Sequence, residues 1–183
     1  MLRRTFTGLA AALVAAPAVL HAQPPMPRRT MAEEIERELP LIPEYTLFDW
    51  IEAEMQPDGG VTLRGQATSK AKNAVLADIQ QLTGAQSLRD EIEILPNGYD
   101  DVRLRFQLFS TLFSSDSALL RYATRAAPPI HILVKQGQVT LKGEVAQLAE
   151  SMLAAMKARS VRGVRGVKND LRVAQPYIDT TAA

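Results

Sequence analysis

Apolar and polar residues alternate along two neighbouring stretches in the C-terminal half of the chain. The alternating apolar positions are Ile130, Ile132, Val134, Val139, Leu141 and Val145. Such alternation is typical of strands that have one buried face. The two stretches are separated by Gln136-Gly137, a two-residue turn of the kind that joins antiparallel strands. The pattern therefore predicts a β-hairpin over 130–145.

The turn and second strand of this hairpin have a counterpart earlier in the chain. The phrase Gly59-Gly60-Val61-Thr62-Leu63-Arg64-Gly65 returns as Gly137-Gln138-Val139-Thr140-Leu141-Lys142-Gly143. Each copy is followed by an alanine-rich helical stretch, then by a glycine (Gly84 or Gly163), and then by alternating apolar and charged residues. Similarity that continues through a strand, a helix and a second strand indicates a duplicated module.

The first copy is expected to open with a helix over 30–39. Thr30 and Glu33 can form a capping box at its start, and Pro40 stops it. Strands are predicted at 45–53, 61–67 and 88–95. A second helix begins at Thr68 or Ser69, and its predicted core positions are Ala71, Val75, Ile79 and Leu82.

The second copy is expected to follow the same plan. A helix is predicted over 146–160 and a last strand over 167–173. The predicted core positions of this helix are Leu148, Met152 and Met156, with the methionines as core filler rather than as a binding surface.

The opening segment of the second copy, residues 101–113, fits two patterns. Residues 102–108 alternate as a strand does, whereas four apolar residues have helical spacing: Val102, Phe106, Phe109 and Phe113. Because the first copy opens with a helix, internal symmetry favours a helix here as well.

Together these elements predict an α+β protein of two tandem αββαβ modules. Each module is expected to be a three-stranded mixed sheet packed by two helices. The first is expected at 28–96 and the second at 100–175, with Pro96-Asn97-Gly98 as the boundary. Residues 176–183 are expected to form a flexible tail.

The first 22 residues have the pattern of a secretory signal. Arg3-Arg4 precede an uncharged stretch over 8–20, and Leu20-His21-Ala22 offers a cleavage site before a proline-rich segment. The stretch is short for a membrane anchor, which favours a signal peptide cleaved near Ala22 and hence an exported protein. The paired arginines suit general secretory export and twin-arginine export equally.

Export limits the chemistry that the chain can perform. The sequence has no cysteine, and His131 is the one histidine left once the signal is removed. A histidine-based metal site or a Ser-His-Asp triad in both copies is excluded by this inventory. Hydrolysis catalysed by carboxylate side chains alone needs a pocket, and the sequence does not indicate one. We therefore expect a non-enzymatic protein with no metal and no cofactor.

Charge differs sharply between the two copies. Residues 24–100 contain 7 Lys and Arg against 14 Asp and Glu, whereas residues 101–183 contain 12 against 6. The first copy thus has a net charge of −7 and the second of +6. The nearly neutral total conceals a dipolar molecule.

Seven basic residues of the second copy are the candidate binding residues. They are Arg103, Arg105, Lys157, Arg159, Arg162, Arg165 and Lys168. Cations beside large apolar residues are typical of elements that meet anionic lipid headgroups. Two plainer interpretations stay open, since phenylalanines at helical spacing usually form core and surface arginines often only maintain solubility. Lipid docking requires these cations to share one face.

These motifs resemble those of the BON domain, a bacterial module of osmotically induced periplasmic proteins and of some envelope secretins. The second copy supplies the glycine-bounded hairpin, then Gly163-Val164, then Asn169-Asp170-Leu171-Arg172-Val173. The first copy departs from the pattern, with Ala85 after Gly84 and Arg89-Asp90-Glu91-Ile92 in place of the Asn-x-Leu segment. The motif glycines of the two copies are Gly59, Gly65, Gly84, Gly137, Gly143 and Gly163.

The resemblance implies a periplasmic, non-enzymatic envelope protein that binds phospholipid, with a role in envelope maintenance or in osmotic or stress protection. A second hypothesis is a protein-interaction module, in which opposite charges pair the two copies or recruit an envelope partner. A third is suggested by Gly163-Val164-Arg165-Gly166, which matches the Gly-x-x-Gly loop of KH domains. Because an exported protein seldom meets RNA, no nucleic-acid partner is expected.

Overall fold

The computed structural model describes residues 30–83, 87–125 and 128–174 of the chain. Three predictions lie outside these described residues: the signal peptide over 1–22, the role of Gly84, and the tail over 176–183.

The first module contains two helical segments, a hairpin, a longer helix and a third strand. Its elements are α1 (Met31–Glu38), the 3-10 turn η1 (Leu39–Leu41), β1 (Trp50–Met55), β2 (Val61–Ala67), α2 (Ser69–Thr83) and β3 (Leu88–Ile94). Strand β2 lies between the other two, antiparallel to β1 and parallel to β3. The predicted capping box is present, since Thr30 and Glu33 each accept a hydrogen bond from the backbone of the other.

The second module repeats this plan. Its elements are α3 (Tyr99–Leu112), α4 (Leu120–Ala123), β4 (Ile130–Lys135), β5 (Gln138–Val145), α5 (Leu148–Ser160) and β6 (Gly166–Val173). Strand β5 is central, antiparallel to β4 and parallel to β6. The prediction of an α+β protein with two mixed three-stranded sheets is confirmed, and the ambiguous segment over 101–113 is helical.

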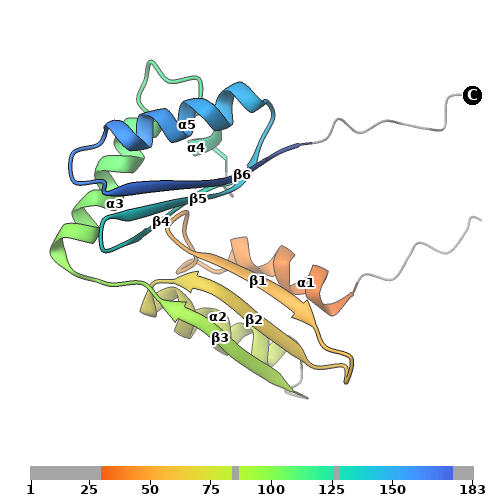
Figure 1. Ribbon diagram of the computed structural model, residues 1–183. Coiled ribbons are helices and arrows are strands. Elements are labelled where there is room, and N and C mark those ends of the chain that lie inside the picture. The colour runs from red at the N-terminus through yellow and green to blue at the C-terminus, as the bar shows by residue number, and fades with distance from the viewer. Residues whose placement is uncertain (1–29, 84–86, 126–127, 175–183) are drawn as a thin grey trace, which may run out of the picture.

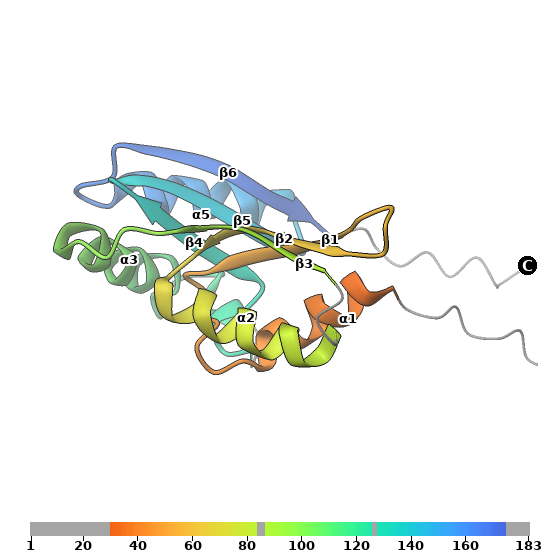
Figure 2. The same cartoon turned by 90° about the horizontal axis from the view of Figure 1, so that it is seen from below.

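Helices cover one face of each sheet. Figure 1 shows the second module above the first, with α5 over the upper sheet and with α1 and α2 behind the lower one. Seen from below, α1 and α2 lie on one side of the molecule and β6 on the other (Figure 2). The helix-free faces meet between the modules, where Trp50 of β1 contacts His131 of β4.

Each module has its own apolar core. The fully buried members of the first include Ile35, Leu63, Val75 and Ile79, and those of the second include Leu108, Leu112, Ile132 and Leu141. Leu47 and Phe48, which precede β1 in the first module, pack against the core of the second. The two cores are therefore separate, but one loop of the first module adds apolar side chains to the core of the second module.

Strand β1 begins later than the sequence pattern predicts. The predicted strand started at residue 45, whereas residues 45–49 form a turn ahead of Trp50. Buried Asp49 explains the difference. Its carboxylate accepts hydrogen bonds from the Thr46 backbone N–H at 2.9 Å and from the Thr68 backbone N–H at 2.6 Å. The turn thus ties the entry to β1 to the start of α2.

Helix α5 is rotated relative to the prediction. Leu148, Met152 and Met156, expected in the core, are 65%, 64% and 61% exposed. The buried side of the helix carries small residues instead, namely Ala154, Ala155 and Ala158. Small side chains allow the helix to approach the sheet closely, so the larger residues face outward. Leu82 at the end of α2 is likewise exposed, contrary to prediction.

Gly65 and Gly143 occupy equivalent positions, and glycine is needed at both for the same structural reason. Gly65 and Gly143 have φ values of +138° and +111°, a conformation that L side chains rarely adopt. A Cβ atom at Gly65 would lie 2.0 Å from the Trp50 carbonyl oxygen, and one at Gly143 would lie 1.9 Å from that of Pro129. In each module, therefore, the chain at the start of the neighbouring strand passes close to the equivalent glycine.

The segment where the first copy departs from the motif makes equivalent contacts. In the second module the Asn169 side chain accepts from the Leu171 N–H and donates to Ser151 of α5. In the first, the Asp90 carboxylate accepts from the Ile92 N–H and pairs with Lys72 of α2 at 2.7 Å. The third strand is fastened to its helix in the same way in both modules.

Candidate functional site

Three of the predicted arginines converge at one end of the second module. Arg103 lies on α3, and Arg162 and Arg165 lie in the loop between α5 and β6. All three line a hollow of about 720 Å³. Arg103 and Arg162 also line an adjoining hollow of about 700 Å³ between α3 and the end of α5. The structure thus brings together residues that are some sixty positions apart in the sequence.

Large apolar side chains accompany these arginines. Tyr99 and Phe106 of α3 line the second hollow and are 79% and 60% exposed. The Arg103 guanidinium lies 5.9 Å from the centre of the Tyr99 ring. The Phe106 ring meets Phe48 of the first module edge to face, with centroids 5.7 Å apart. Cations and aromatic rings are therefore interleaved on the outer face of α3.

The hairpin turn fixes the position of the arginine-bearing loop. The Asp101 carboxylate at the start of α3 accepts hydrogen bonds from the backbone N–H groups of Gln136 and Gly137, at 2.7 and 2.9 Å. The carbonyl oxygen of Gly137 accepts from the Arg165 N–H at 2.9 Å. Helix α3, the turn and the loop are thus linked in a chain of hydrogen bonds.

The charge of this region is positive but not uniform. Among the described residues, Arg159, Arg162 and Arg165 form no ion pair, and Arg103 pairs weakly with exposed Asp100 at 3.9 Å. Asp100 and Asp101 line the larger hollow with the three arginines, whereas no carboxylate of the described residues lines the smaller one. The Asp101 carboxylate is already occupied by backbone donors, so it compensates the arginines only partly.

Arg105 lies apart from the exposed arginines, and its role is to stabilise the fold. Its side chain is only 4% exposed, and its Nη2 donates to the carbonyl oxygens of Pro96 at 2.8 Å and Val134 at 3.0 Å. Burial lowers the pKa of its guanidinium, while Asp101 and Asp49 raise it. The expectation that Arg105 meets an external anion is wrong, because this group fastens the linker between the modules to β4.

The two lysines of the predicted set are also engaged within the fold. Lys157 donates to the Thr111 carbonyl at 3.3 Å and to the Ser114 hydroxyl at 3.1 Å, which connects α5 to the end of α3. Lys168 is exposed and pairs with Asp170 of the same strand at 2.7 Å. Of the predicted basic set, Arg103, Arg159, Arg162 and Arg165 remain available to a ligand.

The outer face of α5 carries an apolar stripe that sequence reasoning did not assign to the surface. We call Leu148, Met152 and Met156 the α5 stripe. They recur every four residues, as positions on one face of a helix do, and Arg159 follows them on the same exposed side. Figure 1 shows α3 and α5 on the same side of the second sheet. The stripe therefore belongs to the same helical layer as Tyr99, Arg103 and Phe106.

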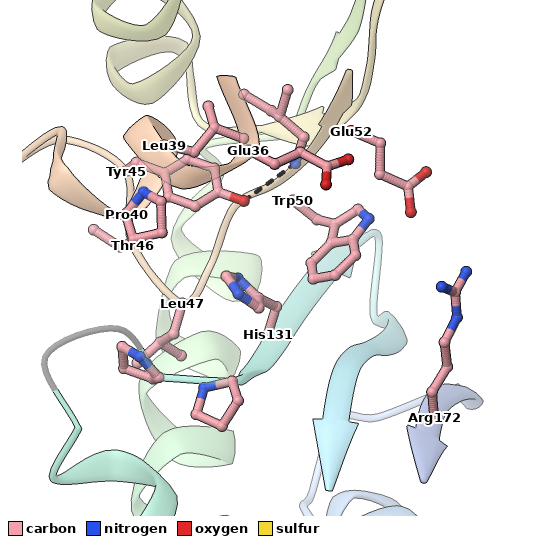
Figure 3. Close-up of a pocket in the computed structure, with 13 residues that line it drawn as sticks. Glu36, Leu39, Pro40, Tyr45, Thr46, Leu47, Trp50, Glu52, His131 and Arg172 are labelled. Atoms are coloured by element: carbon pink, nitrogen blue, oxygen red, sulfur yellow. Dashed lines mark hydrogen bonds between the residues drawn. The ribbon is translucent and has the colours of Figure 1, made fainter. Parts of the chain in front are cut away.

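A third hollow, of a different kind, lies between the modules. We call it the inter-module cleft; it has a volume of about 400 Å³. Its apolar walls come from Leu39, Pro40, Leu47, Trp50, Pro128 and Pro129. Polar groups also line it, from Glu36, Tyr45, Glu52, His131 and Arg172 (Figure 3). The sequence offered one signal for this site, since it contains the single tryptophan and the single histidine outside the predicted signal peptide.

His131 is held in the cleft by the first module. Its Nδ1–H donates to the Asp49 carbonyl oxygen at 2.6 Å. The imidazole lies between two rings, with its centroid 4.9 Å from that of Trp50 and 5.9 Å from that of Tyr45. Burial lowers the pKa of His131, although the Asp49 contacts oppose that effect. The imidazole is therefore neutral at pH 7 and acts as a structural contact between the modules.

Further contacts join the modules around the cleft. The Ile132 N–H of β4 donates to the Leu47 carbonyl at 2.7 Å. Two ion pairs link lysines of the second module to carboxylates of the first, Lys142 with Glu52 at 3.7 Å and Lys135 with Glu93. Opposite charges of the two copies thus pair within one chain, through lysines that the sequence analysis did not single out.

Two features are absent from the described parts of the chain, a membrane-spanning helix and a metal-binding cluster. No helix over 30–83, 87–125 or 128–174 is long and apolar enough to cross a bilayer. Within the same ranges, no group of three or more His, Cys, Asp or Glu side chains is arranged to hold a metal ion.

Comparison with known families finds a match to most of the second module. The family model of the BON domain matches residues 115–175, which confirms the resemblance for this part of the chain. The match starts after α3 and covers the hairpin, α5 and β6. It indicates a non-catalytic, envelope-associated module. The first module lies outside the match, so its assignment to the same family stays a prediction.

Comparison with solved structures gives weak overall similarity. Two structures of CdsD, a structural protein of the Type III secretion system of Chlamydia trachomatis, align with 79% of this chain at TM-scores of 0.32 and 0.31. The sequence identities are 18% and 19%, and the alignments cover 66% and 63% of the CdsD chains. No curated protein matches the sequence.

Proposed function

We propose that this protein is a non-enzymatic, exported envelope protein whose second module docks on anionic phospholipid surfaces. The docking face is the outer side of α3 and α5 together with the loop that follows α5. Such docking would serve envelope maintenance or protection against osmotic or other stress.

One observation carries this proposal: cations and exposed apolar side chains share the helical layer of the second module. Arg103 and Arg162 line the same hollow as the exposed rings of Tyr99 and Phe106. The α5 stripe adds three further exposed apolar side chains on the neighbouring helix. Interfacial elements combine these two kinds of residue, because cations attract anionic headgroups while apolar side chains enter the acyl boundary.

Simple magnitudes support reversible docking. A Lys or Arg near an anionic leaflet contributes about 1 kcal/mol, so Arg103, Arg159 and Arg162 together contribute roughly 3 kcal/mol at moderate salt. Partial insertion of the α5 stripe and of the two aromatic rings adds apolar burial at about 25 cal/mol per Å². Neither contribution alone gives firm binding, and the combination gives binding that depends on both lipid charge and salt.

The acidic first module gives the molecule a preferred orientation. Its net charge of −7 over residues 24–100 is repelled by an anionic surface, whereas the +6 of residues 101–183 is attracted. Helices α1 and α2 lie away from the α3 and α5 layer (Figure 1). An approach that brings α5 toward the lipid therefore keeps the helices of the first module away from it.

The alternative is an envelope protein as the partner of the same face. Opposite charges already pair between the modules through Lys135 and Lys142, so those lysines are not the groups that recruit a partner. The unpaired arginines of the second module could instead meet an acidic protein surface. Lipid dependence separates the two functions, because only the first requires a bilayer.

Co-flotation with liposomes tests the proposal. The protein lacking residues 1–22 is mixed with neutral or anionic vesicles at low and high salt and centrifuged through a density gradient. The proposal predicts flotation with anionic vesicles only, and weaker flotation at high salt. Absence of flotation under every condition would contradict it and would favour the protein partner.

A further inference from the structure

We infer that the inter-module cleft is a binding site for a small apolar organic amine in its protonated form. This site is separate from the lipid-docking face of the second module and shares no lining residue with its two hollows. The inference therefore does not depend on the proposed function.

The size and walls of the cleft suit a small ligand. Its volume of about 400 Å³ lies within the range of small-molecule sites, which often form at interfaces between domains. One wall is the Trp50 ring, and Pro128 and Pro129 contribute ring surfaces from the second module. Leu39, Pro40 and Leu47 contribute the remaining apolar surface from the first. A compact aromatic or alicyclic body is the shape that such walls bury well.

The aromatic lining is held rigidly before any ligand arrives. The Tyr45 hydroxyl accepts a hydrogen bond from the Ile51 N–H at 3.3 Å, drawn as the dashed line in Figure 3. His131 is fixed by its bond to the Asp49 carbonyl and by its two ring neighbours. A preorganised site loses little conformational entropy on binding, which favours affinity for a small molecule.

The polar groups at one end of the cleft favour a cation. Glu36 and Glu52 both line the cavity, and among the described residues Glu36 has no ion-pair partner. Burial raises the pKa of Tyr45, and the charges of Asp49, Glu52 and Glu36 raise it further. Three carboxylates therefore create a negative potential at the Tyr45 hydroxyl. An ammonium group placed there would meet carboxylate oxygens and the neighbouring aromatic faces.

Neighbouring groups show that cations are accepted at this site. The Lys142 ammonium lies 5.4 Å from the Trp50 ring centre while it pairs with Glu52 at 3.7 Å. Arg172 of β6 lines the cleft as well, and its side chain extends toward Glu52 (Figure 3). The ammonium of a ligand is therefore expected at the Glu36 side, away from Lys142 and Arg172. Neutral His131 adds no competing charge at pH 7.

Intrinsic fluorescence can test this inference directly, because Trp50 is the single tryptophan of the chain and forms one wall of the cleft. Three probes of similar size are titrated into the protein lacking residues 1–22: phenethylamine, phenethyl alcohol and 3-phenylpropionate. Excitation at 295 nm avoids absorption by the probes. We expect a saturable change in Trp50 emission, with phenethylamine binding at least about threefold more tightly than the alcohol.

Matched variants on α1 locate the amine. Glu36→Gln should remove most of the preference for the amine over the alcohol. Glu34→Gln should leave the preference unchanged, because Glu34 is exposed on the same helix and does not line the cleft. No saturable change with any probe would overturn the inference. Equal affinities for the three probes, or an amine preference that survives Glu36→Gln, would also overturn it.

Failure of this test and failure of lipid docking are distinguishable. Glu36→Gln leaves the α3 and α5 layer intact, so liposome flotation of this variant should match that of the wild-type protein. Conversely, substitutions in that layer should leave the response of Trp50 to phenethylamine unchanged.

Discussion

His131 of the second module lies edge-on to Trp50 of the first, with ring centroids 4.9 Å apart and ring planes at 75°. The contact joins the two modules across the inter-module cleft, and the Nδ1–H of the same imidazole donates to the Asp49 carbonyl. Because this histidine is buried, its protonation and the stability of the folded chain are coupled.

The coupling predicts a loss of stability on acidification. Burial lowers the pKa of His131 in the folded state, so the unfolded chain takes up the proton more readily. Stability is therefore fully present above the ordinary histidine pKa of about 6.5 and falls as the pH drops below it. Urea unfolding at pH 7.5 and pH 5.5 should show a smaller difference for His131→Phe than for the wild-type protein. Equal pH dependence in the two proteins would contradict the prediction.

Gly143→Ala should strongly destabilise the second module. The residue has a φ of +111°, and an added Cβ would lie 1.9 Å from the backbone oxygen of Pro129, which a side-chain movement cannot relieve. We expect a loss of more than about 2 kcal/mol in the free energy of unfolding. Gly98→Ala is the matched control, since Gly98 has a φ of −66° and no atom within 4 Å of an added Cβ. The control should change stability by less than about 0.5 kcal/mol.

Arg105 and Arg103 should behave differently although both lie on α3. Arg105→Met removes charge-assisted hydrogen bonds to the Pro96 and Val134 carbonyls, and we expect it to cost about 2–4 kcal/mol in the free energy of unfolding. Arg103→Met affects an exposed side chain with one weak ion pair, and its cost should stay below about 0.5 kcal/mol. Chemical denaturation measures both. A tolerated Arg105→Met would show that the linker is not held by this group.

Substitutions in the α5 stripe test whether its side chains lie on the surface or in the core. Met152→Gln with Met156→Gln should leave the free energy of unfolding within about 1 kcal/mol of the wild-type value, because both side chains are largely exposed. Truncating two buried methionines would typically cost several kcal/mol. The same double variant should float less with anionic vesicles at low salt. A large loss of stability would instead place the methionines in the core, as the sequence pattern predicted.

The elements of the fold were largely predictable because they depend on local signals. The alternation around Gln136-Gly137 predicted the second hairpin, and the repeated glycines predicted the first. The reason for Gly65 and Gly143 appears only in three dimensions, where the neighbouring strand passes within contact of each. The capping box of Thr30 and Glu33 likewise needs only neighbours along the chain.

The candidate sites were less predictable because they depend on contacts between distant residues. Helix α5 has apolar residues on two sides, and the sequence does not show that the alanines rather than the methionines face the sheet. Arg105 reads as a surface cation until the fold places the Pro96 and Val134 carbonyls beside it. The sequence suggests that Glu52, His131 and Lys142 lie on the solvated side of strands, whereas all three line a hollow between the modules, where Lys142 pairs with Glu52.

Liposome flotation of an arginine variant tests the central claim most directly. Arg103→Gln with Arg162→Gln removes the two cations of the smaller hollow while keeping polar, exposed side chains. Arg89→Gln is the matched control, since Arg89 is an exposed arginine on β3 of the first module. If the helical layer of the second module docks on anionic lipid, the vesicle affinity of the double variant should fall at least about tenfold, and its binding should depend much less on salt. Arg89→Gln should float as the wild-type protein does. Undiminished flotation of a folded double variant would contradict the account.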